Sequence, residues 1–152
     1  MSSHLIEIAK QKKQEWLNLR KNSHSERKNW AKKVEELYKQ IIEWIKPLEE
    51  EEILKYELTQ EIDEEKEPVS FILGITFFND QTILFQSEEF EVVGAYGRVD
   101  MEFGLRRLMI ILKDKESDWI FTERYGLEKT PTYDFNQETF EQLVTEFIES
   151  FS

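Results

Sequence analysis

The sequence contains no cysteine, and it has no long hydrophobic run. A disulfide framework, a thiolate metal site and a cysteine nucleophile are therefore excluded, and nothing indicates an oxidising compartment. No segment approaches the roughly 18 consecutive apolar residues of a membrane-spanning helix, and the opening residues lack the apolar core of a secretory signal. We therefore expect a soluble, cytoplasmic protein with no membrane partner.

Histidine and glycine are scarce, with two and five copies respectively. His4 and His24 both lie among polar residues, which is typical of surface positions and indicates neither a catalytic base nor a metal ligand. The sequence also lacks the glycine-rich phosphate-binding loops, the acidic calcium loop and the strand-to-helix serine elbow of known catalytic and binding motifs. We expect no metal, no cofactor and no small-molecule ligand, and we predict that the protein is not an enzyme.

One pair of residues leaves an enzymatic alternative open. Asp100 and Lys113 fall on neighbouring predicted strands, where a carboxylate could hold a metal ion and a lysine could orient water. The second metal-binding acid that this chemistry needs is missing, because Ile111 stands in its place. The simpler interpretation places Asp100 at a strand edge and Lys113 in solvent.

Charge, by contrast, is abundant and unevenly distributed. The net charge is −12, from 20 basic and 32 acidic residues. Residues 1–40 hold ten Lys and Arg against five Glu, a net of +5, and residues 41–152 hold ten against twenty-seven Asp and Glu, a net of −17. The acidic part repels phosphate, and the basic part interleaves its lysines with glutamates, so direct nucleic-acid binding is not expected. The opposite charges favour attraction between the two parts, within one chain or between chains, unless each is only a solvated face.

The strongest helical pattern lies in the segment 30–48. Its apolar residues recur in alternating steps of four and three, as in the seam of packed helices. They are Trp30, Val34, Leu37, Ile41, Trp44 and Leu48. A thinner stripe with Leu5, Ile8 and Trp16 precedes it, and the polar stretch 21–25 separates the two. This predicts a hairpin of two antiparallel helices over residues 1–48, with the second helix ending or bending just before Pro47.

The six apolar residues of the second predicted helix form a wider stripe than the first helix can cover. Full burial of six such side chains is worth on the order of 10 kcal/mol before entropy is subtracted. The stripe must therefore meet either another chain or the rest of this one. We predict that it is a partner interface, with an open sheet face as the main alternative.

Downstream of residue 53 the hydrophobic period changes from that of a helix to that of strands. Short apolar runs up to residue 125, one of them at 89–96 and two joined by a turn at Asn79-Asp80, predict an antiparallel sheet of about six strands. The last segment predicts an amphipathic helix, capped by Asn136 and packed on the sheet. The fold class is therefore α+β. It divides into a helical hairpin that acts as an association arm (1–48) and a sheet body with the C-terminal helix (53–152).

The glycines Gly94 and Gly97 bracket Tyr96 and precede Arg98 within the predicted sheet. Glycine in a strand often marks a bulge or tight turn, and Tyr and Arg are favoured at binding hot spots. Tyr96 and Arg98 are therefore candidates for a recognition tip. The alternative is a hairpin in which the tyrosine packs inward and the arginine pairs with a carboxylate.

These patterns predict a non-enzymatic protein–protein interaction module. It would self-associate, as a homo-oligomer, or dock onto another protein through the hairpin, and it would present the acidic sheet body to a partner. The alternative is an acidic inhibitor or immunity-type protein that neutralises a basic nucleic-acid-processing enzyme or toxin, with carboxylates in place of phosphates.

Overall fold

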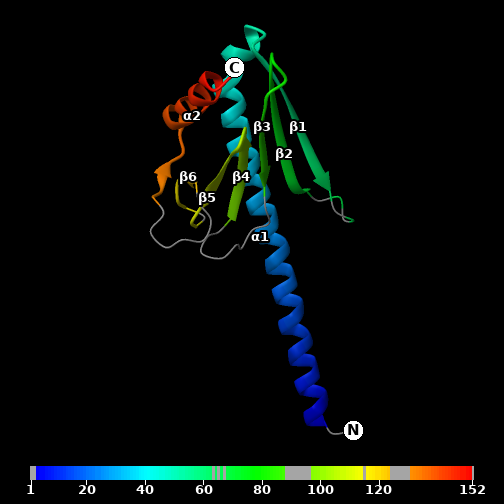
Figure 1. The fold of residues 1–152 in the computed structure, drawn as a ribbon. Helices are drawn as coiled ribbons and strands as arrows, with labels where there is room; N and C mark the ends of the chain where they lie inside the picture. The colour runs from blue at the N-terminus through cyan, green and yellow to red at the C-terminus, as the bar shows by residue number, and fades with distance from the viewer. Residues whose placement is uncertain are drawn as a thin grey trace.

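The computed structural model describes residues 3–62, 64, 66, 68–87, 97–114, 116–123 and 131–151, and for residues 19–27, 68 and 69 it describes the backbone only. Over these ranges the fold is α+β, as predicted. One long N-terminal helix, an antiparallel sheet and a C-terminal helix follow one another along the chain (Figure 1).

The helix α1 (Ser3–Glu50) differs from the predicted hairpin. Its backbone is helical without interruption, and this includes residues 21–25, where the sequence predicts a turn. The expected pair of antiparallel helices is therefore a single long helix. The stretch 21–25 contains neither glycine nor proline, and its polar residues cost only about 0.5 kcal/mol each in a helix interior, so they permit a turn without requiring one.

Pro47 lies inside the last turn of α1 and does not end the helix before it. The helix ends instead at Glu50, and Glu52, two residues further on, has a left-handed φ of 59°. The N–H of Ile53 donates to the carbonyl of Leu48 at 2.9 Å, and the N–H of Glu52 donates to that of Glu49 at 3.0 Å. This pair of bonds is a Schellman motif, here with glutamate at the position where glycine is usual. Because Pro47 has no N–H, the helix lacks one backbone hydrogen bond in its last turn. The Schellman motif follows directly after this turn.

The sheet is a meander in which each strand pairs with the next along the chain. Within the described residues its strands are β1 (Leu54–Ile62), β2 (Pro68–Phe77), β3 (Thr82–Ser87), β4 (Gly97–Phe103), β5 (Arg106–Leu112), β6 (Ile120–Thr122) and β7 (Tyr133–Asp134). The short strand β7 was not predicted, and the predicted strand 89–96 lies outside the described residues. The turn at Asn79-Asp80 is longer than the predicted two residues, because the last β2–β3 pair is Thr76 with Thr82.

Both helices pack on the same face of the sheet. The directly opposed residues Leu73, Phe85, Met101 and Leu108 of β2 to β5 point to this face and are fully buried. The ring of Phe85 lies beneath both helices, 6.2 Å from Tyr38 of α1 and 6.4 Å from Phe140 of α2 (Gln137–Glu149) between centroids. The sheet and the two helices therefore form two layers around one core.

The start of α2 agrees with the prediction from sequence. Asn136 is the N-cap, and its side chain accepts from the N–H of Thr139 at 3.0 Å. The hydroxyl of Thr139 accepts in return from the N–H of Asn136 at 3.0 Å. The rings of Phe135 and Phe140, before and within the first turn, lie 6.1 Å apart. The capping box satisfies backbone donors that a helix start leaves unpaired, and the ring contact packs the chain that enters the helix against its first turn.

Candidate functional site

The six residues that were predicted to meet a partner belong to the core of this chain. Trp30, Val34, Leu37 and Ile41 have between 0% and 3% of their surface exposed, and Trp44 and Leu48 are partly buried against the same cluster. The prediction of a partner interface on this stripe is therefore wrong, and its alternative, the sheet, holds. One sheet face has enough apolar area to accommodate two helices, and the apolar spacing along the chain does not reveal this area.

The same packing changes the predicted division of the chain. One hydrophobic cluster contains residues of α1 from Trp30 to Ile45 together with residues of the sheet and of α2. Residues 30–48 are therefore part of the body, and only the part of α1 that precedes them extends beyond it.

The N-terminal part of α1 projects away from the sheet and from α2 (Figure 1). We call residues 3–18 the arm. Every residue of the arm is exposed. Five of them are large apolar residues, with 41% to 58% of their surface exposed: Leu5, Ile6, Ile8, Trp16 and Leu17. An isolated helix of this length is marginal in water, so exposed apolar side chains on it point to a further contact.

Two of the apolar residues of the arm, Leu5 and Trp16, continue the buried stripe of α1. At about 3.6 residues per turn, Trp16 precedes Val34 by five turns and lies on the same side of the helix. Leu5 precedes Trp16 by about three turns and lies on that side as well. The sheet therefore covers one part of this stripe, and the arm presents the other part at the surface.

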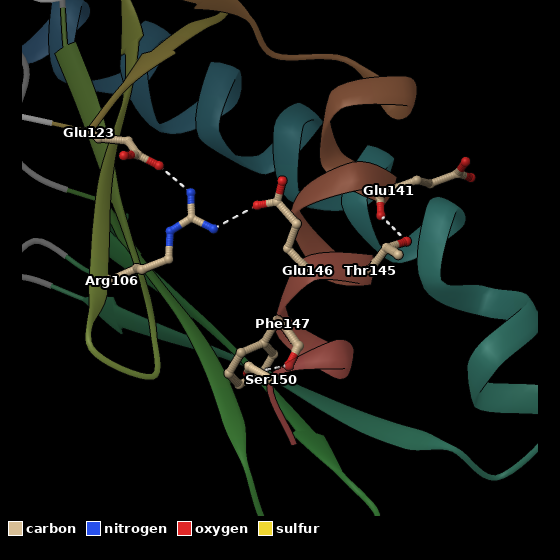
Figure 2. A network of polar contacts seen from close by, with 7 residues as sticks. All are labelled: Arg106, Glu123, Glu141, Thr145, Glu146, Phe147 and Ser150. Atoms are coloured by element: carbon tan, nitrogen blue, oxygen red, sulfur yellow. Dashed lines mark hydrogen bonds and ion pairs between the residues drawn. The ribbon is translucent and has the colours of Figure 1, made fainter. Parts of the chain in front are cut away.

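A second candidate site is a cleft of about 460 Å³ between the β5–β7 side of the sheet and α2. Its central side chain is Arg106, with Glu123 and Glu146 on either side (Figure 2). Arg106 Nη1 donates to Glu146 Oε2 at 2.7 Å, and Nη2 donates to the carboxylate of Glu123. The guanidinium also lies over the ring of Phe103, 5.0 Å from its centroid.

The two carboxylates satisfy this arginine and leave the cleft acidic. Partial burial acts to lower the pKa of Arg106, but the hydrogen bonds and charges of Glu146 and Glu123 outweigh it and raise that pKa. One cation between two carboxylates leaves a net negative charge, which disfavours a phosphate or carboxylate ligand. The three side chains are 40% to 52% exposed, so each ion pair stabilises the protein by at most about 1 kcal/mol. Their evident role is to fasten α2 to β5 and β6.

Arg98, the described member of the predicted recognition tip, lies within β4 and not at a tip. Its Nε is 3.3 Å from Asp100 Oδ1, and the two side chains are 21% and 14% exposed on the sheet face away from the helices. Tyr96 lies outside the described residues. The alternative interpretation, in which the arginine pairs with a carboxylate, therefore holds for Arg98.

The structure also places the two residues on which the enzymatic alternative rests. Asp100 faces Arg98, and Lys113 is exposed just beyond the end of β5. Among the described residues, no three acidic, histidine or cysteine side chains come together to hold a metal ion.

Comparisons with known proteins give no relative. No family model matches the chain, and no curated protein or solved structure resembles it significantly. Neither described helix combines the length and apolarity that crossing a membrane requires.

Proposed function

We propose that the protein is a non-enzymatic protein–protein interaction module that associates through the arm. The observation that carries this proposal is the exposure of five large apolar residues on a helix that extends beyond the body. Full burial of one such side chain is worth about 1.5–3 kcal/mol, and these are already about half covered, so docking all five gains on the order of 5 kcal/mol before entropy.

The partner that suits the arm is a protein with an apolar groove or helix face bordered by acidic groups. Lys10, Lys12 and Lys13 accompany the apolar stripe on the arm, and they favour such a border. Another copy of this chain meets the charge requirement, because residues 41–152 carry a net charge of −17. In this proposal the protein acts in the cytoplasm. A chain without cysteine forms no disulfide bonds, so its fold does not depend on an oxidising compartment.

The test compares two double variants that add equal negative charge to opposite sides of the arm. Leu5→Glu with Trp16→Glu places carboxylates on the apolar stripe, whereas Gln11→Glu with Gln14→Glu places them on the polar side. We expect the wild-type chain and the glutamine variant to retain the same bound protein from native lysate, or the same oligomer mass, and the stripe variant to lose it. Equal binding by all three chains would contradict the proposal.

The second candidate, an acidic inhibitor of a basic enzyme or toxin, rests on the acidic body. Glu50, Glu51 and Glu52 are all exposed where α1 meets β1. An inhibitor of this kind should bind a basic protein with an affinity that falls steeply as salt is added. Titration against a panel of basic nucleases at low and high salt tests this candidate, and affinity that does not depend on salt would rule it out.

A further inference from the structure

Within the described residues, β1 is an edge strand of the sheet, and its outer side is long and exposed. It pairs with β2 on one side and is the first strand in the order of the sheet. Eight of its nine residues are exposed, and Leu54 is the exception. Such an edge presents unpaired backbone N–H and C=O groups that can pair with a further strand.

Natural edge strands usually carry features that prevent this pairing, such as proline, inward-pointing charge or a bulge. β1 contains no proline, and its pairing with β2 is regular from Leu54 to Glu61, with a register shift only before its last residue, Ile62. Tyr56 and Leu58 lie on the helix-covered face and are 37% and 41% exposed, and Ile62, after the register shift, is 58% exposed. Tyr56 and Leu58 stand directly opposite the buried residues Ile75 and Leu73 of β2. The apolar floor of the core therefore continues onto β1, beyond the part that α1 covers.

The sequence of β1 complements itself when two copies run antiparallel about Leu58. In this register Lys55 stands opposite Glu61 of the second copy, and this pair of opposite charges occurs twice. Glu57 stands opposite Thr59, and Tyr56 opposite Gln60, so no like charges face each other. Directly opposed residues on two strands interact, and opposite charges there favour pairing.

Neighbouring registers are worse for identifiable reasons. A shift of the pairing by one residue would place the apolar side chains of one strand directly opposite the charged side chains of the other, on the same face of the sheet. Centring on Glu57 places this carboxylate opposite itself, and centring on Thr59 places Glu57 opposite Glu61 twice. The register centred on Leu58 also pairs all nine residues of the strand, Leu54 with Ile62 at the ends.

We propose that two copies of this chain dimerise by antiparallel pairing of β1 with β1, centred on Leu58, so that one sheet continues through both subunits. This contact is independent of the arm, since β1 lies at the sheet edge and the arm projects from the body (Figure 1). The occupant of the edge is a second copy because the charge pattern of β1 matches its own reverse.

Charge exchange at the two ends of β1 tests both the contact and its register. Sedimentation equilibrium of the full chain should give a mass of twice 18.4 kDa at high concentration. Lys55→Glu or Glu61→Lys alone should each weaken the dimer about tenfold, because two attractive pairs become repulsive. The double variant Lys55→Glu/Glu61→Lys should dimerise like the wild type, and the two single variants should pair with each other when mixed. A chain that stays monomeric at every concentration, or a double variant that remains weakened, would overturn the proposal.

A cross-link provides a second measurement. The chain has no cysteine, so Leu58→Cys introduces a single thiol. In the proposed dimer its Cα lies about 5 Å from that of its mate, within disulfide range. The controls Glu57→Cys and Thr59→Cys place the two thiols on diagonal positions about 7–8 Å apart, so they should cross-link far less. Equal yields from all three variants would contradict the register.

A dimer that is lost in Leu5→Glu/Trp16→Glu but unaffected by both charge variants would assign self-association to the arm and not to β1.

Discussion

Gly97 occupies a position where the core has no room for a methyl group. A Cβ built there would lie 2.7 Å from two ring atoms of Trp30. Gly97→Ala should therefore displace the indole and destabilise the fold by about 1–3 kcal/mol. Gly74→Ala is the matched control, because nothing lies within 4 Å of a Cβ built there, and its effect should be within about 1 kcal/mol. Urea unfolding of the three chains measures the difference, and similar losses for both variants would refute this packing explanation.

The stability of the fold at alkaline pH depends on Tyr38, which lies in the core. Its hydroxyl donates to the carbonyl of Phe71 at 3.1 Å, and burial, with a contribution from the charge of Asp100, raises the pKa of Tyr38 well above the ordinary value of 10.0. Above pH 10 the unfolded chain therefore loses a proton that the folded chain keeps. This contribution to stability is complete below pH 10 and falls by about 1.4 kcal/mol per pH unit above it.

The substitution Tyr38→Phe isolates this effect. It should cost about 1 kcal/mol at neutral pH through the lost hydrogen bond, and it should make the stability less sensitive to alkali. Urea unfolding of both chains at about pH 9, 10 and 11 measures the two slopes. Because the other tyrosines are present in both chains, equal slopes would show that Tyr38 is not the buried titrating group.

At the scale of the elements, α1 combines two environments in one helix. From Trp30 onward its apolar side is buried under the sheet, whereas the arm is exposed throughout. Deletion of residues 1–18 should therefore remove helical signal in circular dichroism but shift the melting temperature by less than about 4 °C, since about 1 kcal/mol corresponds to roughly that shift. A larger decrease would mean that the arm packs on the body and would remove the basis for its role in association.

At the scale of the whole molecule, the two proposed contacts lie on separate elements. The arm presents an apolar and basic helix, and β1 presents a backbone edge with Lys55, Glu57, Thr59 and Glu61 on its outer face. The two helices cover only one face of the sheet, and the apolar strip of Tyr56, Leu58 and Ile62 remains exposed beside them. A chain with both contacts could link a β1 dimer to further proteins through its two arms.

Much of the secondary structure could be predicted from local pattern. Three features each depend on residues that are close together in the sequence. They are the change of period after residue 53, the short connections that require antiparallel pairing, and the helix-start signature around Asn136. The predicted turn at 21–25 failed because polar residues allow a turn or a helix at nearly equal cost. The edge position of β1 was missed as well, because alternation of Leu54, Tyr56 and Leu58 predicts one buried face whether or not a helix covers that strand.

The sequence by itself determined the α+β class, the antiparallel order and the presence of an amphipathic stripe on α1, because these depend on spacing and chain connectivity. Only the tertiary structure decided what covers that stripe. Trp30 meets Trp119 at 5.8 Å between ring centroids, and Trp44 meets Phe140 at 5.4 Å, across long separations in sequence. An apolar periodicity predicts that one side of a helix is buried, but it does not predict against what. The hydrophobic effect is non-directional, so any apolar surface within reach can cover that side. For this reason the residues expected to meet another molecule became the core, and the association surfaces that we propose are the arm and the edge of β1.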